Sequence, residues 1–222
     1  MKNPRSVLPV TNLYRVDTYT VEGYAIDGIE ETGMAGLALS PSTFASLSLA
    51  KPQSPIVTGL VTTYSVVATL SNALAKDDQM LVSFPTAAEI LSGATACAAS
   101  VPSGESLTCS IDTTEQKLTV TNQIEGFSVA AGTALTVNVD SAVRNPQSFR
   151  PSAPFSVTSY LASTAGPLYK MDEDSSSLTV TADTPNELLE VVVERAETEV
   201  NAVNDYSISF RTSNPVPSGA IL

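Results

Sequence analysis

Apolar and polar residues alternate with a period of two along most of this chain. In the segment 117–122, Leu118 and Val120 alternate with Lys117, Thr119 and Thr121. Further alternating segments lie at 64–68, 80–84, 135–140, 177–181 and 190–194. Successive side chains of a β-strand point to opposite faces, so each segment is predicted to be a short strand with one apolar face.

Turn-forming residues separate these strands at short intervals. Gly or Pro marks the turns at 103–104, 131–132, 145–146, 166–167 and 184–186. Turn signals spaced by roughly eight to twelve residues are typical of β-sandwiches and barrels. We therefore predict an all-β fold of immunoglobulin-like β-sandwiches with few or no helices.

One short motif occurs twice in the chain. The segment Asn3-Pro4-Arg5-Ser6 returns as Asn145-Pro146-Gln147-Ser148, a shift in numbering of 145 − 3 = 142, which we call the repeat offset. Proline fixes φ and favours extended geometry in the residue before it, so we interpret the motif as a rigid corner between two strands. The predicted corner residues are Asn3, Pro4, Ser6, Pro9, Asn145, Pro146, Ser148 and Pro151.

A second block repeats at the same offset. The segment 61–66 returns as 203–208, and Ser71-Asn72 returns as Ser213-Asn214. Self-similarity at a fixed period indicates a tandem array, here with a unit of about 142 residues. We predict three parts, which are the closing strands of one sandwich at 1–55, a complete sandwich at 60–200, and the first strands of the next at 203–222.

The charge and composition narrow the function classes. The net charge is −12, whereas binding to nucleic acid or anionic lipid needs clustered Lys and Arg. No apolar run approaches the ~20 residues of a membrane span. Histidine and tryptophan are absent, and the acidic pairs lie in predicted turns, so we expect neither an enzyme nor a cofactor.

The two cysteines, Cys97 and Cys109, flank a predicted bend at Val101–Gly104. Two strands joined by this bend would place the thiols face to face, which predicts a disulfide, although a pair of unlinked buried thiols is the alternative. Disulfides persist in oxidising compartments, so we expect an extracellular or cell-surface protein.

Two further kinds of site are weaker hypotheses. Asp172, Glu173 and Asp174 offer oxygen ligands for calcium, although a solvated acidic turn is the favoured interpretation. No Asn-x-Ser/Thr sequon occurs, so sugars would be O-linked to the Ser/Thr stretches beside proline.

The repeated corner carries a family resemblance. An Asn-Pro-x-Ser corner is followed by Phe or Tyr, then x-Val-x-x-Tyr, a glycine and an acidic turn, as at 145–174. This pattern resembles the repeats of very large secreted surface proteins of protists such as ciliates and flagellate algae. The resemblance implies β-sandwich repeats that build coats or flagellar appendages, and it transfers no active-site residues.

These observations favour a structural role. We predict a repeat unit of an extracellular filament or surface coat, whose partners are copies of itself or further repeats of the same chain. The predicted assembly strand contains Tyr206, Ile208 and Phe210, which would pair across the junction between units. The alternative is an adhesin-like module that binds a glycan or a protein through its loops.

Overall fold

The computed structural model describes residues 6–7, 14–21, 23–31, 39–162, 168–201, 203–216 and 219. Within these ranges the chain forms fourteen β-strands and no helix, which confirms the predicted all-β class. The strands are β1 (Tyr14–Tyr19), β2 (Ala25–Glu31), β3 (Ser46–Lys51), β4 (Val61–Thr69), β5 (Gln79–Ser83), β6 (Glu89–Ile90), β7 (Ala98–Ser100), β8 (Ser106–Asp112), β9 (Lys117–Thr121), β10 (Ala134–Arg144), β11 (Ser156–Leu161), β12 (Tyr169–Asp174), β13 (Leu188–Arg195) and β14 (Tyr206–Thr212).

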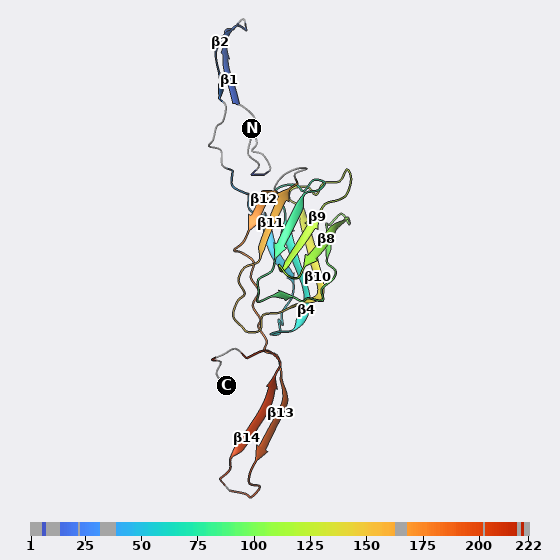
Figure 1. The fold of residues 1–222 in the computed structure, drawn as a ribbon, viewed down its shortest axis with the longest axis vertical. Coiled ribbons are helices and arrows are strands. Elements are labelled where there is room, and N and C mark those ends of the chain that lie inside the picture. The colour runs from blue at the N-terminus through green and yellow to red at the C-terminus, as the bar shows by residue number, and fades with distance from the viewer. Residues whose placement is uncertain are drawn as a thin grey trace.

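Ten of these strands form one antiparallel sheet in the middle of the molecule (Figure 1). Its order is β12-β11-β5-β9-β8-β7-β10-β4-β3, and the short β6 pairs with β10. The sheet curls over on itself, so that β4 and β10 face β5, β9 and β11 across a single apolar core. We call this curled sheet the central sheet.

The apolar and polar residues of the predicted alternation lie on the two opposite faces of this sheet. Every second residue of β5, β9 and the first half of β10 is buried, as in the pair Leu118 and Val120. One predicted strand is absent, because 177–181 forms no ladder. Leu178 and Val180 are nevertheless buried, and their carbonyl oxygens accept hydrogen bonds from the backbone of Phe155 and Ser152.

Three aromatic rings join the two halves of the curled sheet. Tyr64 on β4 lies 6.0 Å from Phe84 and 6.3 Å from Phe155, measured between ring centroids, and the latter two are 5.0 Å apart. Phe84 follows β5 and Phe155 precedes β11, so the cluster spans both halves. Large aromatic side chains of this kind contribute much of the buried apolar area of a core.

A disulfide links the segment before β7 to β8, across the turn that joins these two strands. Cys97 and Cys109 are bonded, with a Cα–Cα distance of 5.6 Å, which confirms the predicted pairing. The bond closes a loop between residues twelve positions apart, around the turn at 101–105. A loop of this length restricts the unfolded chain and stabilises the folded one.

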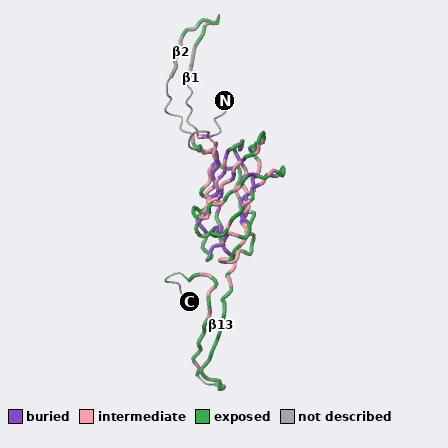
Figure 2. The backbone as a smooth tube through the Cα atoms, turned by 45° about the vertical axis from the view of Figure 1, so that its right-hand side comes forward, coloured by how far each residue is buried: buried purple, intermediate pink, exposed green. Residues whose placement is uncertain are grey.

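Two hairpins lie outside the central sheet, at opposite ends of the molecule (Figure 1). Strands β1 and β2 pair with each other, as do β13 and β14, and each pair is a separate two-stranded sheet. Every residue of β13 is exposed, and Figure 2 shows the exposed class along almost the whole C-terminal hairpin.

Strand pairing divides the chain differently from the predicted boundaries near residues 55–60 and 200. Strand β3, which the repeat pattern assigned to the preceding sandwich, pairs with β4, and Phe44 lies in the same core. At the other end, the last buried residue before β13 is Ala182. The segment that shares one core therefore runs from about Ser42 to Asp183, and the first residues of β3 and β13 are separated by the repeat offset, 188 − 46 = 142.

Candidate assembly surface

The C-terminal hairpin presents one apolar face to solvent. In the register of β13 with β14, Val193 lies opposite Ile208 and Arg195 opposite Tyr206, and Phe210 follows on the same side. We define the apolar hairpin face as Val193, Tyr206, Ile208 and Phe210. The opposite face is more polar and contains Val192, Ser207, Ser209 and Arg211.

The counterparts of this face, one repeat offset earlier in the chain, are buried. Tyr206 and Ile208 are 63% and 61% exposed, whereas Tyr64 and Val66 on β4 are 0% and 1% exposed. Strand β4 is paired on both sides, by β3 and β10, and it packs on the core. Strand β14 pairs only with β13 among the described strands.

A cluster of hydrogen bonds joins the base of this hairpin to the central sheet. Thr58, which is buried, accepts hydrogen bonds at Oγ1 from the backbone N–H of Asn186 (2.9 Å) and from Nδ2 of Asn214 (3.1 Å). Both amide side chains also donate to the Thr58 carbonyl oxygen, at 3.2 and 3.3 Å. One residue therefore fastens both strands of the hairpin.

The close approach at this junction requires glycine at position 59. Gly59 has a φ of +66°, and a Cβ built there would lie 1.7 Å from Oδ1 of Asn214. Its N–H donates to the Pro146 carbonyl oxygen at 3.0 Å, which ties the junction to the repeated corner. A side chain at Gly59 would displace Asn214 and strain the backbone.

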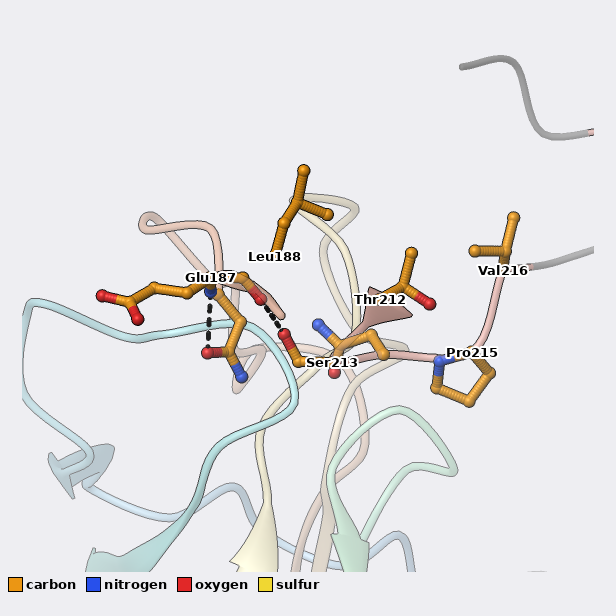
Figure 3. A pocket seen from close by; sticks show the side chains of 8 residues that line it. Glu187, Leu188, Thr212, Ser213, Pro215 and Val216 are labelled. Carbon is orange, nitrogen blue, oxygen red and sulfur yellow. Dashed lines mark hydrogen bonds between the residues drawn. The ribbon is translucent and has the colours of Figure 1, made fainter. Parts of the chain in front are cut away.

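A shallow groove of about 230 Å³ lies beside this junction, between the start of β13 and the end of β14. Figure 3 shows Leu188, Thr212 and Val216 along it, with Ser213 donating to the Glu187 carbonyl oxygen. In the central sheet, the counterpart Ser71 donates in the same way to the Thr43 carbonyl oxygen, at 2.6 Å. The repeated Ser-Asn pair thus makes the same strand-end contact in both places.

The second member of that pair has different partners in the two places. Nδ2 of Asn72 donates to the carboxylate of Asp172 at 2.8 Å, and the backbone N–H of Asn72 donates to the other carboxylate oxygen at 3.2 Å. Hydroxyls of Ser42 and Ser159 also donate to Asp172, at 2.7 and 3.1 Å. We call these four residues the Asp172 cluster.

The Asp172 cluster closes the curled sheet. Ser42 precedes β3 at one end of the strand order, and Asp172 lies on β12 at the other end. The two form an isolated parallel bridge, with backbone hydrogen bonds of 2.9 and 2.8 Å. The carboxylate is fully buried and is satisfied by neutral donors, as a buried charge requires.

The structure does not bring the three calcium candidates together. Asp172 is held in its cluster, and Glu173 forms an ion pair with Lys170 at 2.5 Å. Asp174 accepts hydrogen bonds from Ser176 and Ser177; burial raises its pKa, but these bonds outweigh that effect and lower it. Among the described residues, no group of three His, Cys, Asp or Glu could hold a metal ion.

The repeated corner acts through its asparagine. Asn145 is buried, and its Oδ1 accepts a hydrogen bond from the Tyr64 hydroxyl at 3.1 Å while its Nδ2 donates to the Val57 carbonyl oxygen at 2.9 Å. Burial raises the pKa of Tyr64, so this phenol stays protonated and donates. The corner therefore holds the loop that contains Thr58 against the end of β10.

The other corner residues have smaller roles or lie outside the described residues. Ser148 accepts a hydrogen bond from the Arg150 backbone at 3.4 Å, and Pro151 is exposed. Ser6 is buried, next to the contact between Val7 and the Lys170 carbonyl oxygen. Asn3, Pro4 and Pro9 lie outside the described residues.

Sequence patterns alone did not identify Thr58, Gly59 and Asn186 as junction residues. Nothing in their local pattern separates them from an ordinary turn, because their role depends on segments more than 120 residues away. The fourth junction residue, Asn214, was indicated by the sequence, because the Ser213-Asn214 pair is repeated. In the same described part of the chain, no helix is long and apolar enough to cross a membrane.

Comparisons with known proteins give no family. No protein-family model matches the chain, and no curated protein is significantly similar to it. A collagen-binding domain from a Staphylococcus aureus adhesin matches over 64% of this chain and 98% of its own, with 9% identity and a TM-score of 0.35. AvmM, which catalyses macrocyclization in alchivemycin A biosynthesis, matches over 78% of this chain and 91% of its own, with 7% identity and a TM-score of 0.26. At these scores, neither likeness carries an argument about function.

Proposed function

We propose that this chain is a structural building unit of an extracellular filament or surface coat, made of tandem immunoglobulin-like β-sandwiches whose period is the repeat offset. The observation that carries the proposal is the apolar hairpin face. It repeats the buried face of β4 at the same spacing, but it is exposed. Contiguous exposed apolar patches commonly mark surfaces that other protein covers.

The strand correspondences support the tandem arrangement. Tyr14, Val16 and Tyr19 on β1 align with the pattern at 155–160 around β11 at a shift of 155 − 14 = 141, one residue short of the repeat offset. The first residues of β3 and β13 are separated by the repeat offset itself. The N-terminal hairpin thus corresponds to the last hairpin of the central sheet, and the C-terminal hairpin to its first. In this proposal the central unit is Ser42–Asp183, and the flanking hairpins belong to the units on either side.

The chemistry of the surface agrees with a passive role outside the cell. The disulfide favours an oxidising compartment, and the net charge of −12 favours solubility over adhesion to nucleic acid or anionic lipid. We propose no catalytic activity and no cofactor, and we keep O-linked glycans on exposed Ser and Thr as part of the proposal.

A hybrid chain tests the tandem arrangement. Residue 222 corresponds to residue 222 − 142 = 80, so residues 81–184 are appended after Leu222. We expect two sandwiches, in which the backbone amides of Tyr206–Thr212 become as slow in hydrogen exchange as those of β4. A hybrid with Ser209→Asp, on the polar face of β14, is the matched control and should fold equally well. Fast exchange across β14 in the hybrid would contradict the proposal.

Electron microscopy tests the role in a filament. Antibodies against the central sheet label the native material, and the expected result is a regular fibre whose axial repeat corresponds to one unit. Separate particles without a repeat would favour the alternative of an adhesin-like binding module.

A further inference from the structure

We propose that the apolar hairpin face of one copy docks on the N-terminal hairpin of a second copy, so that copies join head to tail. The inference rests on the proposed function, because it names the contact by which one unit meets the next. It also commits to one occupant of the exposed face, which is the β1–β2 hairpin of another molecule.

The central sheet already contains the template for this contact. Strands β3 and β4 end the strand order on one side, and β11 and β12 end it on the other. The two hairpins meet at the bridge between Ser42 and Asp172, and across the core Tyr64 on β4 faces Phe155 beside β11. The chain therefore folds with a β3–β4 type hairpin against a β11–β12 type hairpin.

Each terminal hairpin carries one half of that template. The segment Tyr24-Ala25-Ile26-Asp27 matches Tyr169-Lys170-Met171-Asp172, with Tyr and Asp identical, at a shift in numbering of 169 − 24 = 145. Met171 is 1% exposed in the core, whereas Ile26 is 60% exposed. The N-terminal hairpin thus exposes at Ile26 a position that the template buries, as the C-terminal hairpin does at Ile208.

The two residue types of the template's polar contact recur in the sequence as well. Asn214 corresponds to Asn72, and Asp27 corresponds to Asp172, and in the central sheet the side chains of Asn72 and Asp172 are hydrogen-bonded at 2.8 Å. Asp27 lies opposite Thr18 in the ladder of β1 with β2. An Asn and an Asp at the template positions are therefore available in sequence on the two terminal hairpins.

One copy cannot make this contact with itself. The two hairpins lie at opposite ends of the molecule, with the central sheet between them (Figure 1). A contact between different surfaces of two copies is heterologous, and when it does not close into a ring it extends as an open chain. The geometry therefore yields a fibre from a single kind of interface.

Sedimentation velocity of the full chain across a wide concentration range tests the proposal. Wild type is expected to form chains that lengthen with concentration. Ile208→Asp and Ile26→Asp each place a carboxylate in the docked face and should weaken association by at least about tenfold. The controls are Ser209→Asp, on the opposite face of β14, and Val21→Asp, in the turn of the N-terminal hairpin, and both should behave as wild type.

Mixing the two weakened variants fixes the direction of docking. Ile208→Asp retains an intact N-terminal hairpin and Ile26→Asp an intact C-terminal one, so an equimolar mixture should give dimers and no longer species. If Ile26→Asp alone associates as wild type does, the apolar face pairs with something other than the N-terminal hairpin, and the proposal is wrong.

The hybrid chain separates failure of this inference from failure of the proposed function. If wild type stays monomeric while the hybrid forms two sandwiches, the face is covered by continuation of the same chain, and only the docking of copies is overturned. If wild type stays monomeric and the hybrid leaves β14 unprotected, both proposals fall.

Discussion

The β3–β4 hairpin and the β13–β14 hairpin have similar patterns and opposite surroundings. In the first, Tyr64 and Val66 are buried among aromatic rings and aliphatic side chains of the facing strands. In the second, Tyr206 and Ile208 occupy the same places on an antiparallel pair and face solvent. The hairpins themselves do not account for this difference, since both are paired ladders with one apolar side.

The comparison shows that an apolar face on a strand marks a surface that neighbouring strands or another molecule can cover. Fully burying one side chain such as Ile or Val stabilises a fold by about 1.5–3 kcal/mol. Two such side chains would therefore contribute about 3–6 kcal/mol, a large share of the roughly 5–15 kcal/mol that holds a domain folded. Covering the C-terminal hairpin would therefore favour assembly or folding of a further unit, although association itself costs about 4–15 kcal/mol and needs a larger interface than these two side chains.

Replacing Tyr64 and its counterpart Tyr206 by alanine should give the largest difference in the free energy of unfolding. We expect Tyr64→Ala to lower the free energy of unfolding by about 3–5 kcal/mol, because it leaves a cavity in the aromatic cluster. Tyr206→Ala should change it by less than about 0.5 kcal/mol in the monomer. Urea unfolding followed by far-ultraviolet circular dichroism, at a concentration where the chain is monomeric, measures both. Equal losses would mean that the hairpin face is already covered within one copy.

Removing the disulfide should have the next largest effect, confined to the central sheet. We expect the double variant Cys97→Ser with Cys109→Ser to unfold at lower urea, with a loss of roughly 3 kcal/mol. Amide exchange in β13 and β14 should not change, because neither strand lies within the bridged loop. A reducing agent should destabilise wild type to the same extent and leave the double variant unaffected, and any other pattern would contradict this prediction.

Asp172→Asn tests the cluster that closes the sheet. An amide NH2 in place of one carboxylate oxygen would face the Asn72 N–H or the Ser159 hydroxyl, and we expect a loss of about 1–3 kcal/mol. Glu173→Gln, the next residue on β12, removes a partly exposed ion pair and should cost about 1 kcal/mol or less. Thermal unfolding of both variants compares them, and a larger loss for Glu173→Gln would refute this role for Asp172.

The smallest expected effect is a pH dependence at the junction. Hydrogen bonds from Ser54, Thr184 and the Ile56 backbone hold the pKa of Asp183 below its ordinary value of 3.8. A lowered folded-state pKa gives stability that is present above pH 3.8 and is lost as the pH falls through the folded-state value. Asp183→Asn should therefore lose less stability than wild type between neutral pH and pH values below 3.8.

Glu197→Gln on the exposed hairpin makes the same change in net charge and is the control for Asp183→Asn. Its unfolding profile should keep the acid-dependent loss seen in wild type. If both variants flatten the profile equally, net charge rather than the junction explains the effect.

Local patterns predicted most of the strands and the disulfide. Alternation of apolar and polar residues is a property of each segment, so it identified β5, β9 and β10 without knowledge of their partners. It failed at 177–181, where Leu178 and Val180 alternate and are buried, but the backbone bonds to an extended segment at 152–155 and forms no ladder. Burial and ladder pairing are separate properties, and alternation guarantees neither. Val191 and Val193 also alternate and lie in the β13–β14 ladder, but both are exposed.

The boundaries of the central unit depended on pairing rather than on pattern. The predicted boundaries lie near residues 55–60 and 200, yet β3 pairs with β4 across the first and β13 pairs with β14 across the second. The first residues of β3 and β13 keep the spacing of the repeat offset under this shift, and the tandem arrangement that the offset predicts stays a proposal.

The sequence by itself determined the all-β class, the strand faces, the disulfide and the repeat offset, because each follows from residue type and spacing along the chain. Only the tertiary structure decided which apolar faces are buried and which residues hold the junction. Thr58, Asn186 and Asn214 meet across more than 120 positions, and Asp172 meets Ser42 across 130. Contacts at such separations depend on the path of the whole sheet, so no local pattern specifies them.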